Sequence, residues 1–245
     1  MKANYKPYDL EDSVSRIDEI LKAKGCSYEE KDIIPPREKL KFTNGFYVNC
    51  SALFVDIRKS SELTASHQKR VLAKLYRAYI SEVVAVINGN SQCKELNVVG
   101  DCVSGIFHTQ HRSDVDEVFY TAAQVSSLID ILNYKLKRNK IKGITVGIGI
   151  ALGRTLMIKA GYEGSGINEV VWMGDAVNEA SKLASQGNKQ LLAWKCPELM
   201  VSNYFYDHLT GSNQKKLEKN IDYDCYQGKV FAADMKTLCK QKCTG

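Results

Sequence analysis

Two aspartates beside apolar segments could bind a divalent metal ion together. Asp56 directly follows the apolar run 52–55, and a carboxylate at the end of a buried strand is unfavourable unless a positive charge meets it. Asp101 lies in a Gly-Asp turn within segment 96–107, whose two apolar halves are typical of a β-hairpin. If this hairpin lies beside the first strand, both carboxylates and the backbone carbonyl of Ile57 converge as oxygen ligands, which Mg²⁺ and Mn²⁺ prefer.

The same residues also allow simpler interpretations. A lone acidic residue after an apolar strand is commonly a helix cap or a turn residue, and Gly-Asp is an ordinary hairpin turn. The order of the motifs favours the metal site, because the 45 residues from Asp56 to Asp101 leave room for one long helix, predicted at 64–88. Backbone amides near Ser60 and Ser61, at the start of the helix after Asp56, would suit a phosphate chain. Either serine could cap that helix.

An amide and a cation lie four residues apart in a third segment. Residues 170–173 read as a short strand, Gly174 as a turn, and 175–184 as an amphipathic helix. Asn178 and Lys182 project from one face of that helix, where they could hold a ribose oxygen and a phosphate. The alternative is an exposed helix face on which the two side chains bind nothing.

Hairpin strands and long helices alternate along the chain, which favours an α+β fold. A second long helix is predicted at 114–139, and strands are expected at 141–157 and 169–173. The expected architecture is a mixed, largely antiparallel sheet flanked by helices, with the helices on one side. Three glycines precede no helix as a phosphate loop would, so we interpret them as close-packing or bulge positions. They are Gly147, Gly149 and Gly153.

Residues 1–43 are predicted to form an extension of one catalytic domain at 44–245. Apolar residues at helical spacing predict a helix at 10–24, and the Pro35-Pro36 pair then forces an extended linker. We expect this helix to pack on its own domain or on a second subunit.

Composition and charge limit the classes of function. The length of 245 residues suits one domain with a full core. The net charge of +6 suits a polyanionic substrate, and no nucleic-acid-binding motif is recognisable, so we expect no direct contact with nucleic acid. Without an apolar run of about 18 residues we expect no membrane span. Eight cysteines without a recognisable secretory signal indicate reduced thiols and a cytoplasmic location.

The three motifs together resemble the class III nucleotidyl cyclases, the family of adenylate and guanylate cyclase catalytic domains. In that family the first strand ends in Asp-Ile, the hairpin carries Gly-Asp, and a later helix opens with Gly-x-x-Val-Asn-x-Ala-x-Arg. Here these motifs read Asp56-Ile57, Gly100-Asp101 and the segment 174–182. The resemblance covers roughly residues 44–235.

This resemblance implies a role for each matching residue. Asp56 and Asp101, with the carbonyl of Ile57, would bind two divalent cations per site, Mn²⁺ or Mg²⁺, on the triphosphate. Asn178 would orient the ribose. Lys182 stands where the family has an arginine that stabilises charge on the transferring phosphoryl group; it keeps the charge but lacks the forked donor set.

The positions that read the base in this family differ here from both purine signatures. Adenylate cyclases carry a lysine and an aspartate there, and guanylate cyclases a glutamate and a cysteine, whereas this chain has Asn97 and Val171. The Asn97 amide presents a donor and an acceptor side by side, which suits the Watson–Crick edge of uracil or cytosine. Alternatively, Asn97 is a plain strand residue and a purine is read elsewhere. Tyr47, just before the first strand, could reach a base or belong to the core.

These departures and the compact architecture resemble the pyrimidine cyclases of the bacterial Pycsar anti-phage system. The resemblance implies a phosphorus–oxygen lyase that converts UTP or CTP to 3′,5′-cyclic UMP or cyclic CMP plus pyrophosphate, and a separate cyclic-nucleotide-binding effector that senses the product. It also implies a homodimer with composite active sites, in which the Asp pair comes from one chain and Asn178 with Lys182 from the other. Two alternatives are a purine cyclase of the same fold and a non-catalytic, nucleotide-binding regulatory module.

Overall fold

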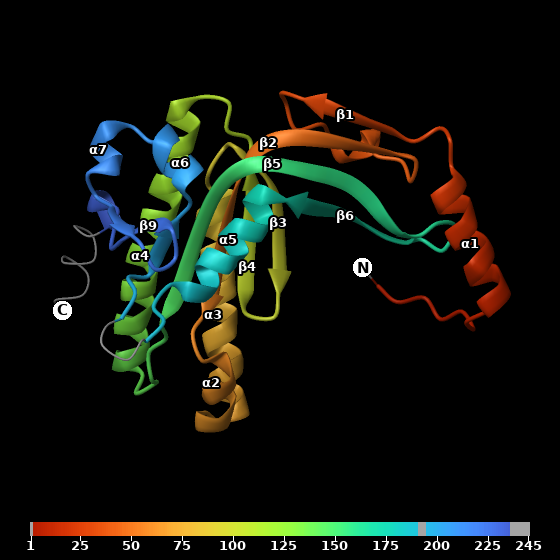
Figure 1. The fold of residues 1–245 in the computed structure, drawn as a ribbon. Helices are drawn as coiled ribbons and strands as arrows, with labels where there is room; N and C mark the ends of the chain where they lie inside the picture. The colour runs from red at the N-terminus through yellow and green to blue at the C-terminus, as the bar shows by residue number, and fades with distance from the viewer. Residues whose placement is uncertain (1, 191–194, 236–245) are drawn as a thin grey trace.

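One sheet with strands of mixed direction forms the centre of the computed structural model, which describes residues 2–190 and 195–235 (Figure 1). The strands follow the order β3-β4-β2-β5-β7-β9-β8, while β1 pairs with β2 and β6 with β5. Only the pairs β1–β2 and β5–β7 are parallel among the described strands. The predicted mixed, largely antiparallel sheet is therefore confirmed. The strands are β1 (Ser27–Lys31), β2 (Asn44–Ile57), β3 (Cys93–Val99), β4 (Cys102–Phe107), β5 (Val146–Tyr162), β6 (Ile167–Gly174), β7 (Leu199–Val201), β8 (Glu218–Asn220) and β9 (Cys225–Gly228).

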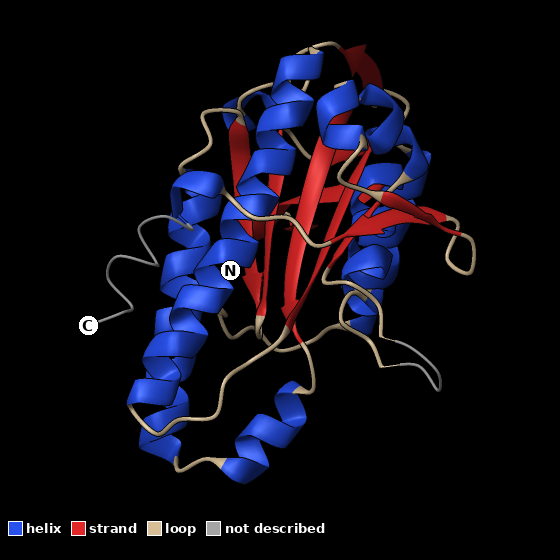
Figure 2. Ribbon diagram, turned by 90° about the vertical axis from the view of Figure 1, so that its left-hand side faces the viewer, coloured by secondary structure: helices blue, strands red, loops and turns tan. Residues whose placement is uncertain are grey.

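Helices cover both faces of the sheet, which corrects the expectation of helices on one side (Figure 2). Helices α3 and α4 pack on the face that carries Leu53 and Val55, and α5 packs on the opposite face, with Ala52 and Ala151. Successive side chains of a strand point to opposite faces, so β2 serves both layers. The helices are α1 (Leu10–Lys22), α2 (Ser60–Ser66), α3 (Lys69–Asn88), α4 (Arg112–Arg138), α5 (Asp175–Gln186), α6 (Asn203–His208) and α7 (Gly211–Gln214), with a 3-10 helix η1 (Arg37–Lys39).

Of the two long helices predicted from the sequence, one is divided and the other is confirmed. The long helix predicted at 64–88 is divided into α2 and α3, because the chain is extended at His67 and Gln68. The second long helix, predicted at 114–139, is confirmed as α4.

In the part of the chain that the structure describes, no helix has the length and apolarity needed to cross a membrane.

Glycines let α5 lie directly on β5. A Cβ at Gly149 would lie 2.1 Å from the carbonyl oxygen of Ala180, and a Cβ at Gly147 would lie 2.0 Å from that of Ala184. A side chain at either position would collide with the helix backbone, so only glycine permits this approach. Gly153 faces the first turn of the same helix. The interpretation of these glycines as close-packing positions is confirmed.

The strands β2 and β5 continue beyond the core as a paired, curved arch (Figure 1). The outer part of the arch carries β1 on one edge and β6 on the other, and α1 lies at its far end. Helix α1 confirms the prediction at 10–24, and its Arg16 guanidinium lies 4.6 Å from the centre of the Tyr162 ring. The segment between α1 and β2 is more than a linker, since it contains β1 and η1. The domain boundary at residue 43 stays a prediction.

The cysteines that the structure describes are free thiols. Burial raises the pKa of the Cys50 thiol to about 11, so this side chain is not a thiolate at neutral pH.

Candidate active site

Asp56 and Asp101 come together at one end of the sheet. Asp56 is the penultimate residue of β2, where it pairs with Gly147 of β5. Asp101 lies in the tight turn between β3 and β4, after Gly100, whose φ of 63° favours glycine. Burial raises the pKa of Asp56, Arg58 lowers it, and the charge of Asp101 raises it. The two carboxylates therefore lie near enough to repel each other, and the predicted hairpin beside the first strand is confirmed.

The surroundings of this pair suit a cation. The Oδ2 atom of Asp101 is buried and has no hydrogen-bond partner among the described residues, which is unfavourable unless a positive group meets it. Burial and the charges of Asp56 and Asp101 raise the pKa of the Cys102 thiol to about 11. In residues 2–190 and 195–235, no group of three or more His, Cys, Asp or Glu side chains is placed so that it could hold a metal ion by itself. Further oxygen ligands would therefore come from the Ile57 carbonyl, water or substrate.

Arg58 belongs to this site, although the sequence reasoning did not single it out. Its guanidinium pairs with Asp56, and its Nη1 donates a hydrogen bond of 2.7 Å to the carbonyl of Ser185 in α5. The side chain is only 15% exposed, and its Nε is buried without a partner among the described residues. Arg58 thus offsets the charge of Asp56 and fastens the end of α5 to the end of β2.

Ser60 and Ser61 form the start of α2, directly after the aspartate strand. The residue at the N-cap position is Lys59, with a left-handed φ of 57°, and the helix has no side-chain cap. The expectation that Ser60 or Ser61 caps this helix is therefore wrong. Their role in phosphate binding stays a prediction.

Asn178 and Lys182 lie on the exposed side of α5. The predicted strand, glycine turn and helix are confirmed, since β6 ends at Gly174, whose φ is 139°, and α5 begins at the next residue. No hydrogen bond or ion pair within the described chain joins Asn178 or Lys182 to Asp56 or Asp101. The described chain therefore contains two separate groups of predicted site residues.

The predicted base-contacting residues lie on three different strands. Asn97 is on β3, four residues before Asp101, and Val171 is on β6; both are half-buried. Tyr47 lies on β2, nine residues before Asp56, which corresponds to about 30 Å of extended strand. The Arg154 guanidinium covers its ring at 3.6 Å. Tyr47 is therefore not beside the Asp pair of its own chain, and its contact with a base stays a prediction.

A surface pocket of about 530 Å³ lies apart from the Asp pair. Its lining residues are Glu30, Asn49, Leu152, Gly153, Arg154, Asp175, Glu179 and Tyr204. Three carboxylates make this pocket unfavourable for a triphosphate. We therefore place the candidate site at the converging aspartates and not at this cavity.

A family model described as the adenylate and guanylate cyclase catalytic domain matches residues 43–231. The chain belongs to this family. It is 45% identical over 230 residues to a uridylate cyclase of Gulbenkiania mobilis, covering 91% of this chain and 87% of the relative. It is 37% identical over 225 residues to a uridylate cyclase of Treponema porcinum, covering 89% and 77%. The crystal structure of the adenylyl cyclase CyaB from P. aeruginosa shares the fold, with a TM-score of 0.59 at 21% identity over 71% of this chain and 84% of that one.

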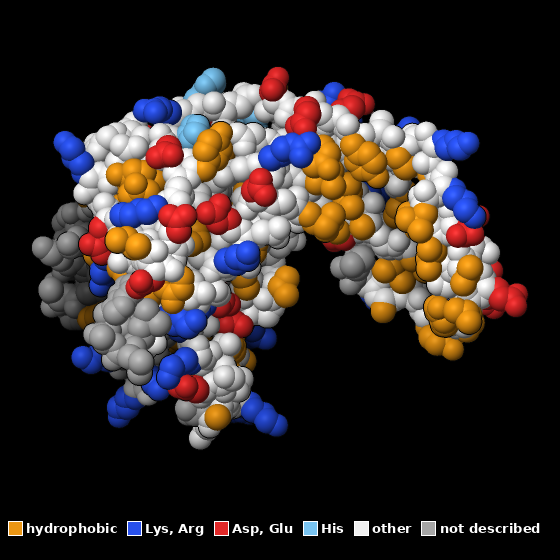
Figure 3. Space-filling model, in the orientation of Figure 1, with side chains coloured by type: hydrophobic (Ala, Val, Ile, Leu, Met, Phe, Trp, Pro, Cys, Tyr) orange, Lys and Arg blue, Asp and Glu red, His pale blue; other side chains and the backbone are white. Residues whose placement is uncertain are grey.

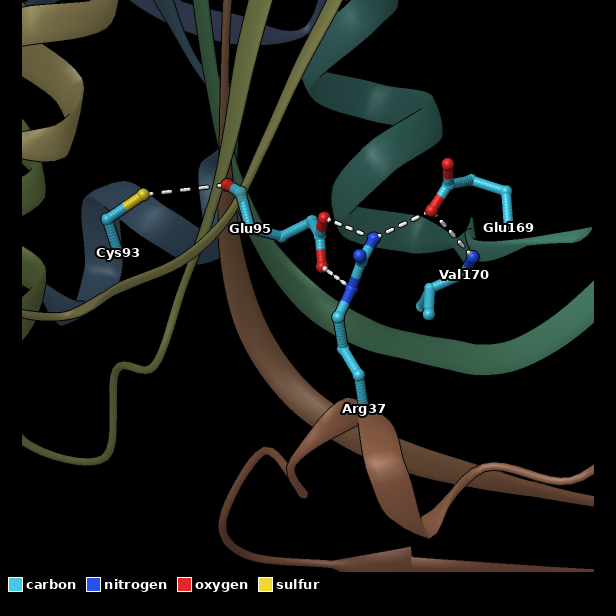
Figure 4. Close-up of polar contacts among 5 residues, drawn as sticks. All are labelled: Arg37, Cys93, Glu95, Glu169 and Val170. Atoms are coloured by element: carbon cyan, nitrogen blue, oxygen red, sulfur yellow. Dashed lines mark hydrogen bonds and ion pairs between the residues drawn. The ribbon is translucent and has the colours of Figure 1, made fainter. Parts of the chain in front are cut away.

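The predicted family resemblance is confirmed, and with it the enzyme class of nucleotidyl cyclases. One ionic cluster of this cyclase was not predicted. Arg37 of η1 lies between Glu95 of β3 and Glu169 of β6 and contacts both (Figure 4). Because Arg37 precedes the residues that the family model matches, the family motifs gave no signal for it.

Proposed function

We propose that the protein is a uridylate cyclase, which converts UTP to 3′,5′-cyclic UMP and pyrophosphate. The observation that carries this proposal is the identity of 45% and 37% to two relatives named uridylate cyclase, each over about nine tenths of the chain. Asn97 and Val171 support it, since neither purine signature is present. The Asn97 amide could face uracil or cytosine, and the relatives favour UTP over CTP.

Asp56 and Asp101, with the carbonyl of Ile57, would hold two divalent cations, Mn²⁺ or Mg²⁺. The buried, unpartnered oxygen of Asp101 and the raised pKa of Asp56 support this role. Bound divalent ions would supply acidification of the ribose 3′-hydroxyl and neutralisation of the triphosphate. Arg58 would then share Asp56 with a cation.

Asn178 and Lys182 would act on the other side of the substrate. The Asn178 amide would hold the ribose so that its 3′-oxygen faces the α-phosphorus. As the 3′-oxygen forms its bond to phosphorus, the bond to the bridging oxygen of the β-phosphate breaks and pyrophosphate leaves. Lys182 would stabilise the charge on the phosphoryl oxygens, as a point charge and not as a planar fork.

The active enzyme would be a homodimer with two composite sites. Within one chain Asn178 and Lys182 are exposed and make no described contact with the Asp pair. Apolar side chains also remain exposed on α1 and along the inner side of the arch (Figure 3). A two-fold axis would place α5 of each subunit against the Asp pair of its partner.

The product would serve as a second messenger of anti-phage defence in the cytoplasm, sensed by a separate cyclic-nucleotide-binding effector. The resemblance to the Pycsar pyrimidine cyclases supports this role. Measurement of cyclic UMP in infected cells that carry either the wild type or the Asp56→Ala variant would test it.

Product analysis tests the reaction itself. The purified protein would be incubated with Mn²⁺ and with UTP, CTP, ATP or GTP separately, and the products identified by mass spectrometry. We expect cyclic UMP from UTP, and none from the Asp56→Ala variant. A cyclic purine as the main product would contradict the base assignment, and the absence of any cyclic nucleotide would contradict the proposed activity.

A further inference from the structure

The Arg37 side chain joins two strands that the sheet itself does not join. Its Nε donates to Glu95 Oε2 at 3.0 Å, and its Nη2 donates to Glu95 Oε1 and to Glu169 Oε1, each at 2.8 Å (Figure 4). The contact with Glu95 is the two-pronged type that only arginine provides. Because one nitrogen serves both carboxylates, the strands β3 and β6 are held within reach of a single guanidinium.

This proximity depends on the curvature of the arch. Along the rows of paired residues, Glu95 is level with Ala151 of β5, whereas Glu169 pairs with Ala160. Nine residues of extended strand span about 30 Å, so a straight β5 would keep the two carboxylates far apart. No backbone pairing joins β3 to β6 among the described strands. Arg37 therefore closes the arch across a gap that hydrogen bonds of the sheet leave open.

A β-bulge aims Glu95 at this gap. The pairing of β3 with β4 shifts by one residue between Cys93 and Glu95, and such a shift turns the following side chains to the other face. Cys93 accordingly packs against the core under α3 and α4, whereas Glu95 reaches Arg37. No further shift follows, so Asn97, two residues later, projects to the same side as Glu95.

The same alternation applies to β6. Glu169 and Val171 are two residues apart in a regular strand, so they share a face. Arg37 thus contacts each strand two residues before a residue that would contact the base. On β3 its partner Glu95 precedes Asn97, and on β6 its partner Glu169 precedes Val171.

Electrostatics make the link sensitive to loss of Arg37. The Glu95 side chain is only 9% exposed, and that of Glu169 is 39% exposed. Without the guanidinium, two carboxylates would face each other, one of them nearly buried, and they would repel. The strands β3 and β6 would move apart to relieve this repulsion. The base pocket between them would then be wider and would favour a larger base.

We propose that Arg37 is a positioning residue for base selection: it sets the separation of Asn97 from Val171 and so keeps the base pocket narrow enough for a pyrimidine. This inference rests on the proposed function, in which those two residues contact the base. It assigns a role in selecting a uracil-sized base to a segment that precedes the matched cyclase domain.

The test compares UTP with ATP in variants of the triad. Steady-state kinetics with Mn²⁺ would be measured for the wild type, Arg37→Gln, Arg37→Lys and Glu169→Gln. We expect Arg37→Gln to raise the KM for UTP about tenfold with kcat within about twofold, and to lower the UTP-over-ATP ratio of kcat/KM about tenfold, the scale on which pocket fit discriminates substrates. Arg37→Lys keeps the charge without the fork and should fall between Arg37→Gln and the wild type.

Lys219→Gln is the matched control, since Lys219 forms an exposed ion pair with Asp224 on another part of the surface. This variant should leave the KM for UTP and the UTP-over-ATP ratio of kcat/KM unchanged. If the Arg37 variants leave the UTP-over-ATP ratio of kcat/KM unchanged, including by losing kcat/KM equally for both substrates, the inference is overturned and Arg37 has a merely structural role. If Arg37→Gln does not fold, the same comparison is made with Arg37→Lys and Glu169→Gln. A lowered UTP-over-ATP ratio of kcat/KM supports the inference, and an unchanged ratio overturns it.

Binding separates this inference from the proposed activity. Affinities for non-hydrolysable UTP and ATP analogues would be measured by calorimetry with the same proteins. If the wild type prefers the UTP analogue and Arg37→Gln loses that preference, the inference stands even where no cyclic product forms. A wild type without preference for the UTP analogue contradicts the pyrimidine assignment and the inference together.

Discussion

Gly149→Ala perturbs the contact on which the position of α5 depends. The added Cβ would lie 2.1 Å from the Ala180 carbonyl oxygen and 2.3 Å from the Ala184 amide nitrogen, both in the helix backbone. Since ordinary contacts begin near 3.4 Å, α5 must move by about 1.3 Å. Overpacking of this kind costs about 3 kcal/mol, equivalent to roughly 6–12 °C in the melting temperature of a chain this long. A shift of about 1 Å in Asn178 and Lys182 should also lower kcat/KM about 100-fold.

Differential scanning fluorimetry and cyclase assays of the same preparation would check both effects. Gly211→Ala is the matched control, because a Cβ there meets nothing within 4 Å; its melting temperature should stay within about 1 °C of the wild type. If Gly149→Ala melts within about 2 °C of the wild type and keeps full activity, the packing of α5 and its link to the site are refuted.

Substitutions at three further positions probe the site residues. Asp101→Asn should lower activity at least about 100-fold, and Mn²⁺ should raise the melting temperature of the wild type but not of this variant; an equal rise in both would remove Asp101 as a ligand. Because burial and Asp101 raise the pKa of Asp56, the stability contributed by its protonated form is lost as pH rises through that pKa. The metal-free Asp56→Asn variant should therefore gain stability relative to the wild type as the pH rises from about 4 to 7; a difference in melting temperature that does not grow across this range would contradict the buried charge. Lys182→Ala should lower kcat about 100-fold with little change in KM, whereas Lys182→Arg should keep most activity; a normal kcat for Lys182→Ala would exclude its role in charge stabilisation.

Local sequence patterns were enough to predict the Asp pair and the α5 segment. Asp56 follows an apolar run and Asp101 sits in a Gly-Asp turn, so each position depends on only a few neighbouring residues. The strand, turn and helix around Gly174 are local in the same sense. The two aspartates converge because β2 pairs with β4 of the hairpin. Elements that are near each other in the chain commonly lie side by side, which made this pairing predictable.

Residues whose partners are distant in sequence could not be predicted in this way. Arg37 meets Glu95 and Glu169 only because β5 curves and because a bulge turns Glu95, and neither feature has a periodic signal. Arg58 finds its second partner in α5, which is 127 residues away. The placement of α5 on the opposite face depends on glycines that were identified as close-packing positions without a known partner.

We expect two groups of residues that are separated in one chain to form one UTP-cyclising site between two chains. Mixing Asp56→Ala with Asn178→Ala under conditions of confirmed subunit exchange tests it most directly, with UTP as substrate. Each variant alone should be inactive, and the mixture should regain up to about a quarter of the wild-type cyclic UMP formation, because half of the dimers are heterodimers with one intact site. Exchange without any recovered cyclic UMP would contradict a site shared between two chains.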